Sequence, residues 1–188
     1  MSLYDGFNFE YGLFNFDKER LKYSRVFEYN RDKAVAYAHK WAFGRNPAYF
    51  DFSNLGGDCT NFASQVIYAG SGVMNYTKTF GWYYINANNR SPSWTGVNYL
   101  YNFLINNKGP GPFGEEVDVK DVQPGDIVQL SFVGNNHFNH SPIVVSTGNP
   151  PSLGNILIAA HSYDRDNYPL TGYSWLQIRF IHIKGVRK

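Results

Sequence analysis

Cys59 is the only cysteine of the sequence, and it stands in the stretch NLGGDCTNFASQVIYAG, residues 54–70. A lone cysteine cannot form an intramolecular disulfide, so it is a buried filler, a reactive thiol or a metal ligand. Apolar residues at helical spacing follow two glycines, and this pattern predicts Cys59 in the first turn of a helix. There the helix dipole and the free N–H groups favour the nucleophilic thiolate and can face the oxyanion of a tetrahedral intermediate.

Two of the five histidines are expected to meet at one end of a β-sheet. His140 opens the strand-like run HSPIVVS, His161 closes the run ILIAAHS, and the turn sequence TGNPPSLGN lies between them. In an antiparallel pair the start of one strand lies beside the end of the next, so His140 and His161 are predicted to be neighbours. One can then act as general base towards Cys59, while the other orients it through a hydrogen bond to its second ring nitrogen.

The elements that must position these residues divide the chain into a helical part and a β-rich part. Periodicity with caps and stops predicts helices over residues 30–44, 58–70 and 94–105, with a long loop or lid between the last two. After the breaker NNKGPGPFG come the strand-like runs EEVDVKDV, GDIVQLSFV, HSPIVVSTG, NILIAAHSY and SWLQIRFIHI. This order predicts one α+β domain, residues 29–188, in which N-terminal helices pack on a C-terminal antiparallel sheet. Residues 1–28 are expected to form an irregular arm.

The sequence contains, in this order, the strings GGDCTNFASQ, PGDIVQLSF, NHSPIVV and ILIAAHS. Together they resemble the putative amidase domain family of the papain-like superfamily, which also holds the NlpC/P60 and CHAP cell-wall hydrolases. The similarity runs from about Tyr29 to the C-terminal strand. It implies a papain-like fold with Cys59 as nucleophile at the start of the central helix, His140 as general base and His161 as the polar third member that orients the imidazole. The implied reaction is hydrolysis of an amide bond in bacterial cell-wall peptide.

Four further residues are candidates for binding the substrate or the oxyanion. NlpC/P60 relatives carry a tyrosine upstream of the cysteine that helps to bind the reacting group, and Tyr49 is the nearest candidate by position. Asp58, directly before the cysteine, either contributes to this site or caps the helix. Trp82 and Trp94 flank an Asn-rich segment and either wall a substrate groove or anchor the core.

A metal site is one alternative interpretation of the same side chains. Cys59, with the three histidines at positions 137, 140 and 161, has the residue types of a zinc site. The spacing of His137 and His140 opposes this interpretation, because residues three apart on a strand point to opposite faces. A metal on Cys59 would also block its nucleophilic chemistry. The sequence therefore favours a hydrolase that needs no metal and no cofactor.

A non-catalytic module that binds glycans or peptides is the other alternative. Aromatic residues make up 18% of the chain, with 15 Tyr, 15 Phe and 4 Trp, and flat rings can line a groove for sugars or peptides. In such a module Cys59 is expected to be buried and inert. The hydrolase and the binding module thus differ in the reactivity expected of one thiol.

Charge and hydrophobicity exclude other partners. A formal net charge of +2 without a cluster of Lys or Arg gives no basis for nucleic-acid binding. No stretch reaches the roughly 18 apolar residues that a membrane span needs. The start MSLYDGFNFEYG lacks the basic and apolar regions of a signal peptide, whereas the family resemblance implies a protein that works outside the cytoplasm at the cell wall.

Overall fold

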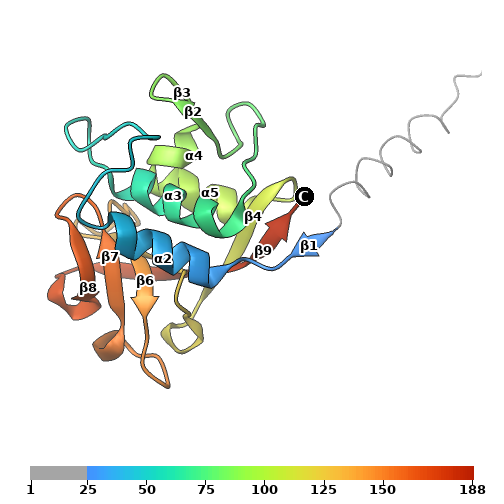
Figure 1. The fold of residues 1–188 in the computed structure, drawn as a ribbon. Coiled ribbons are helices and arrows are strands. Elements are labelled where there is room, and N and C mark those ends of the chain that lie inside the picture. Colours follow the sequence, from blue (N-terminus) through green and yellow to red (C-terminus); the bar gives the residue numbers. More distant parts are fainter. Residues whose placement is uncertain (1–24) are drawn as a thin grey trace, which may run out of the picture.

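The fold is that of a computed structural model in which residues 25–188 are described. Within this range, helices and a curled antiparallel sheet form a mixed arrangement (Figure 1), so the predicted α+β class is confirmed. The expected irregular arm, residues 1–28, lies almost wholly outside the described residues. The helices are α2 (Arg31–Trp41), α3 (Cys59–Ser71), α4 (Pro92–Thr95) and α5 (Val97–Asn106), and the 3-10 turns are η1 (Val119–Asp121), η2 (Leu153–Asn155) and η3 (Leu170–Gly172).

The main sheet has the strand order β1-β9-β5-β6-β7-β8, and β4 pairs with the other edge of the long strand β9. All its pairs are antiparallel, as predicted. The strands are β1 (Val26–Phe27), β2 (Tyr84–Asn86), β3 (Asn89–Arg90), β4 (Gly111–Val117), β5 (Ile127–Ser131), β6 (Ile143–Ser146), β7 (Leu157–Ala160), β8 (Arg165–Pro169) and β9 (Gln177–Arg187), of which β2 and β3 form a separate hairpin.

Alternating side chains of the central strands supply two apolar clusters, one on each face of the sheet. On the helical face, α2 packs against α3, β6 and β7, and α5 packs against β4 (Figure 1). Ile143 and Ala159 belong to this core together with Phe62 of α3. Val144 and Ile158, one position along, belong to the second cluster. The helices therefore cover one face, as the sequence predicts, and fix α3 against β7.

The first two helices begin where the sequence predicts. Asn30 caps α2 through its side-chain oxygen, which accepts a hydrogen bond of 2.9 Å from the Lys33 N–H. The helix α3 begins at Cys59 and ends at Ser71 rather than at Gly70, and Gly72 caps it in the left-handed conformation with φ 64°. Gly70 lies inside the helix. Glycine is needed at this position because α3 packs closely on Tyr29, and a Cβ there would lie 2.3 Å from the Tyr29 ring.

The third predicted helix, residues 94–105, is interrupted at Gly96. This residue has an extended backbone, with φ −112° and ψ 125°, and separates α4 from α5. A Cβ at this position would lie 2.8 Å from the ring of Tyr99 and 3.0 Å from the carbonyl oxygen of Pro92. The predicted loop or lid before it contains the β2–β3 hairpin, and the strand β8 was not predicted because RDNYP has no alternating apolar pattern.

Candidate active site

Cys59 is the first residue of α3 and is only 8% exposed. Gly56 and Gly57, shortly before Cys59, have backbone φ values of 95° and 110°, which residues other than glycine rarely adopt. The chain can thus turn sharply into the helix and leave the thiol at its N-terminus. The predicted position of Cys59 in a first helical turn is therefore confirmed.

Burial, however, changes the expected charge of the thiol. It raises the pKa of Cys59, and hydrogen bonds from Thr60 and from the backbone N–H of Ser141 offset this rise only in part. The Thr60 hydroxyl lies 3.8 Å from the Cys59 sulfur. The expectation that the helix N-terminus makes the resting group a thiolate is therefore wrong for this arrangement, in which the thiol stays protonated at neutral pH.

The chain segment that carries His140 lies next to this thiol. The Oγ of Ser141 accepts a hydrogen bond of 3.4 Å from the Thr60 hydroxyl, which places the segment containing His140 against the first turn of α3. His140 itself exchanges two backbone hydrogen bonds with Leu130 of β5 and is 5% exposed. Burial lowers the pKa of its imidazole to about 4, so the ring is neutral at pH 7 and can accept a proton.

His161 follows β7 directly and uses both ring nitrogens in contacts with groups other than His140. Its Nδ1 lies 2.6 Å from the Asp58 Oδ2, and its Nε2 lies 2.9 Å from the Trp41 carbonyl oxygen. A carbonyl only accepts, so Nε2 donates to it, and Nδ1 faces the carboxylate. The ring also stacks on Phe62 at 4.0 Å. In this arrangement His161 does not orient the imidazole of His140, which was its expected role.

The register of the sheet explains why the two histidines do not meet. Ile143 of β6 is opposite Ala159 of β7, and continuing this register sets His161 opposite Ser141 rather than His140. Opposed residues share one face of a sheet, and the adjacent residue points to the other face. His161 accordingly contacts α2 and α3, whereas His140 faces a different set of side chains.

Asp58 connects the first turn of α3 with two other segments. Its carboxylate is fully buried and accepts hydrogen bonds from the Phe52 N–H (2.9 Å) and the Asn61 amide (2.8 Å), besides its contact with His161. Asp58 occupies the N-cap position of α3, as expected, but its side chain makes no capping hydrogen bond to the helix. Its backbone N–H instead donates to the Ser162 hydroxyl at 2.8 Å, which ties the β7–β8 turn to the helix start.

Two functional candidates are residues that sequence reasoning missed, Tyr173 and Gln129. The Tyr173 hydroxyl lies 3.2 Å from Nε2 of His140, and the Gln129 amide lies 3.3 Å from the Ser141 Oγ. Tyr173 stands in the connection between β8 and β9, 33 residues from its partner, and no local pattern marks it. Gln129 is a buried polar residue inside an apolar strand, which is a signal that sequence analysis could have used.

The other predicted binding residues lie in or beside the core. Trp82 and Trp94 are fully buried, and their indole N–H groups donate to Ser64 and Asn61 respectively. Tyr49 is half-buried and stacks on Trp94 with 5.8 Å between ring centroids. These three rings pack against one another, so the tryptophans anchor the core instead of walling a groove.

The zinc alternative gains no support from the structure. Among residues 25–188 no group of three or more His, Cys, Asp or Glu side chains could hold a metal ion. His137 is exposed in a turn in which its N–H bonds the Gly134 carbonyl oxygen, and the rings of His140 and His161 are bonded elsewhere. In the same described range, no helix is both long and apolar enough to cross a membrane.

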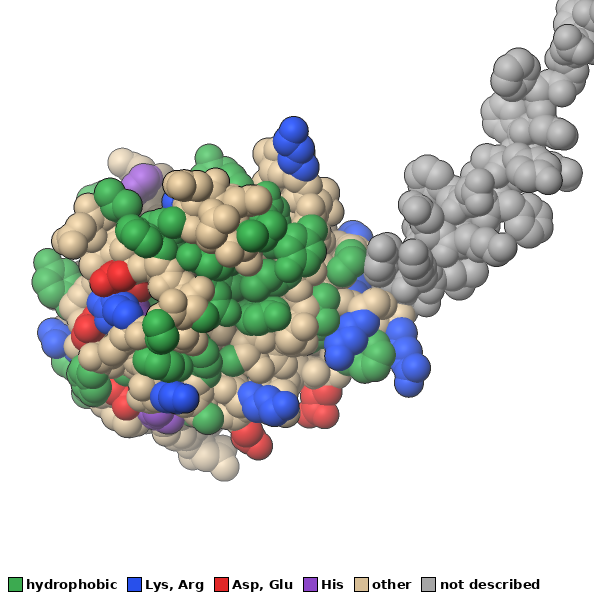
Figure 2. Space-filling model, turned by 45° about the horizontal axis from the view of Figure 1, so that its top comes forward, with side chains coloured by type: hydrophobic (Ala, Val, Ile, Leu, Met, Phe, Trp, Pro, Cys, Tyr) green, Lys and Arg blue, Asp and Glu red, His purple; other side chains and the backbone are tan. Residues whose placement is uncertain are grey.

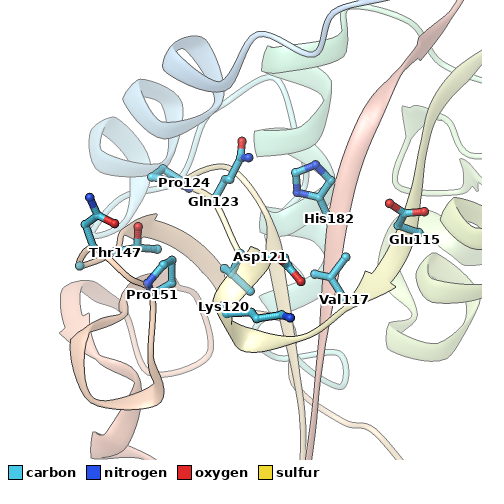
Figure 3. A pocket seen from close by; sticks show the side chains of 12 residues that line it. Glu115, Val117, Lys120, Asp121, Gln123, Pro124, Thr147, Pro151 and His182 are labelled. Carbon is cyan, nitrogen blue, oxygen red and sulfur yellow. The ribbon is translucent and has the colours of Figure 1, made fainter.

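A cavity of about 680 Å³ lies at the opposite end of β6 from His140 (Figure 3). It is lined by Thr147 and Gly148, which follow β6, and by His182, whose Nδ1 lies 2.9 Å from the buried carboxylate of Asp126. Arg31 contacts the same carboxylate at 2.7 Å, so this cluster joins α2 to the sheet. The cavity does not include the candidate nucleophile.

Comparison with known proteins identifies a family and one curated relative. The family model described as "Putative amidase domain" matches residues 28–183, a range that contains all the candidate site residues described above. "Uncharacterized protein YhbB" of Bacillus subtilis (strain 168) is 36% identical over 152 residues, which are 79% of this chain and 46% of that protein. The chain thus spans about half the length of the curated relative it matches. No solved structure matches it.

Proposed function

Because the chain belongs to the putative amidase domain family, we propose that it is a hydrolase that uses Cys59 to cleave an amide bond. One observation carries the assignment of the nucleophile. The sulfur of Cys59 stands at the N-terminus of α3 beside the backbone N–H of Ser141, the residue that follows a buried and neutral histidine. Ser141 thus links the thiol to the segment that carries the proposed base, and a thiol, a base and free helical N–H groups are the parts that acyl transfer needs.

The protonation states favour a general-base mechanism. As the Cys59 sulfur attacks the carbonyl carbon, the neutral imidazole of His140 takes the thiol proton. The tetrahedral intermediate breaks its C–N bond, and His140 gives that proton to the leaving amine. The resulting thioester is then hydrolysed by a water that His140 deprotonates, and the proton returns to the sulfur. The backbone N–H of Cys59, at the positive end of α3, is the proposed donor to the oxyanion.

The finer parts of this proposal concern fold, substrate and location. We propose a papain-like fold, which is supported by a nucleophile at the start of a helix that packs on an antiparallel sheet and by a histidine shortly before one of the inner strands of that sheet. The sequence resemblance to NlpC/P60 and CHAP hydrolases favours bacterial cell-wall peptide as the substrate, cleaved by an amidase or an endopeptidase. Such a substrate would place the protein outside the cytoplasm.

A second candidate function, non-catalytic binding of a glycan or peptide, is favoured by the surface. Figure 2 shows apolar side chains gathered on one face of the molecule. Phe80, 83% exposed, and Tyr99, 63% exposed, line a cavity of about 540 Å³ together with Asn102 and Asn106. Aromatic rings beside amide groups suit sugars and peptides alike.

An assay with purified peptidoglycan distinguishes the hydrolase from the binding module. We expect the full chain to release fragments with a new amine and a new carboxylate, which mass spectrometry detects, and Cys59→Ser to release none. His140→Gln removes the proposed base. His137→Gln, which changes an exposed histidine, is its matched control and should keep full activity. Binding of peptidoglycan without cleavage by the unmodified protein would support the binding module. Cleavage by Cys59→Ser at the unmodified rate would overturn the proposed nucleophile.

A further inference from the structure

The imidazole of His140 has one hydrogen-bonded side-chain partner in the described part of the chain, and that partner is Tyr173. The Tyr173 hydroxyl lies 3.2 Å from Nε2, and the two rings meet edge to face with 5.3 Å between centroids. Tyr173 follows η3, where its N–H donates to the Leu170 carbonyl oxygen at 3.1 Å. The contact therefore joins the connection between β8 and β9 to the segment that precedes β6.

Neighbouring rings hold this contact in place. Phe132 packs beside both partners, with its ring centroid 6.0 Å from that of His140 and 6.2 Å from that of Tyr173. Tyr168 packs edge to face on Tyr173 from β8, at 5.5 Å. The phenol thus has a fixed direction, and His140 is almost fully removed from water. A hydrogen bond in such a site is stronger than one in solvent.

The charge of the partner matters for the base. A carboxylate beside an imidazole favours its protonated form, whereas a phenol forms a hydrogen bond without adding a charge. Burial raises the pKa of Tyr173 to about 12, and a smaller contribution comes from the nearby Cys59, so the phenol is neutral at pH 7. The candidate nucleophile therefore lies within electrostatic range of the same hydroxyl.

The direction of this hydrogen bond decides which ring nitrogen can serve as base. In a neutral imidazole one nitrogen donates and the other accepts. If Nε2–H donates to the phenol oxygen, Nδ1 keeps its lone pair, and Nδ1 has no hydrogen bond within residues 25–188. His161 cannot replace Tyr173 here, because both its ring nitrogens are already bonded.

Resting on the proposed hydrolase function, we infer that Tyr173 is a positioning residue that holds His140 in its Nε2–H tautomer and leaves Nδ1 as the base for the Cys59 thiol. This is the role that the sequence had suggested for His161. The phenol also stays bonded to Nε2–H after the imidazole has taken the thiol proton, so it keeps the ring aligned through both proton transfers.

Tyr173→Phe tests this role because it keeps the ring and removes only the hydroxyl. We expect kcat on the cleaved substrate to fall about five- to tenfold with KM changed less than twofold, as for the loss of one neutral hydrogen bond at the base. Tyr168→Phe is the matched control: it removes a hydroxyl that donates to the Gly172 carbonyl oxygen at 3.2 Å, and it should keep kcat. Equal kcat for Tyr173→Phe and the unmodified protein would overturn the inference.

The tautomer can be measured without any substrate, which separates this inference from the proposed function. NMR spectra of the full chain with ¹⁵N-labelled histidine report the tautomer of each ring. The signals of His140 are identified as those that are missing from the spectrum of His140→Gln. We expect them to show a protonated Nε2 and an unprotonated Nδ1 at pH 7, and to shift towards a mixture of tautomers in Tyr173→Phe but not in Tyr168→Phe. A protonated Nδ1 in the unmodified protein, or a tautomer that Tyr173→Phe leaves unchanged, would refute the inference even if the protein cleaves amides.

Discussion

Burial of His140 predicts a specific dependence of stability on pH. The pKa of its imidazole is about 4 in the folded protein and 6.5 as the unperturbed value, and only burial causes the shift. Below pH 6.5 the unfolded chain therefore binds a proton that the folded protein does not bind. This loss of stability begins as the pH falls through 6.5 and is complete below about pH 4.

The size of the effect follows from these two pKa values. One pKa unit corresponds to about 1.4 kcal/mol, so the contribution of His140 to the free energy of unfolding falls by about 2 kcal/mol between pH 7 and pH 5. Carboxylates titrate in the same range and add their own contributions. A variant without the imidazole is therefore needed to isolate that of His140.

Urea unfolding of three proteins at pH 7 and pH 5 measures this contribution. We expect the unmodified protein to lose about 2 kcal/mol more than His140→Gln over this interval, because glutamine does not titrate. His137→Gln changes an exposed histidine and should follow the unmodified protein. If His140→Gln loses as much stability between pH 7 and pH 5 as the unmodified protein does, His140 is not buried as a neutral base and the reasoning fails.

Two further predictions concern the neighbouring buried groups. Alkylation of Cys59 by iodoacetamide should be slow at pH 7 and accelerate up to and beyond pH 9, because burial raises the pKa of the thiol, and a rate that is already maximal at pH 7 would contradict this. Slow alkylation at pH 7 therefore does not separate the hydrolase from the binding module, which the cleavage assay does. His161→Gln should lower the free energy of unfolding by about 3 kcal/mol, since it removes the shortest contact of the buried Asp58 carboxylate, which keeps the Phe52 N–H, the Asn61 amide and Arg45 at 3.7 Å. His39→Gln, which breaks a more exposed contact with Asp166, should cost about 1 kcal/mol or less in urea unfolding.

Local signals were sufficient to predict the elements that carry the nucleophile. Asn30 caps α2 with its own side chain, and the glycines before Cys59 allow the turn that starts α3. Both features depend on residues adjacent in the chain. Gly96 shows the limit of such signals, because the interruption of the third helix depends on the close approach of Tyr99 and Pro92, which helical periodicity does not reveal.

Contacts between distant segments decided the rest of the site. Asp58 has the residue type of a helix cap, but its carboxylate is used by Phe52, Asn61 and His161, which come from three different segments. A capping residue and a buried anchor look alike in sequence. Tyr173 could not be recognised at all, since one tyrosine among 15 has no distinguishing neighbours.

The two histidines show how strand pairing can place residues correctly and still misjudge their roles. Pairing of β6 with β7 does bring His140 and His161 to one end of the sheet. Side chains alternate in direction along each strand, however, so a register difference of one residue gives the two rings different partners. His161 then reaches the carboxylate that precedes the nucleophile, while His140 meets a phenol. We therefore propose that two histidines divide two tasks: His140 transfers the proton, and His161 anchors the start of the helix that carries the nucleophile.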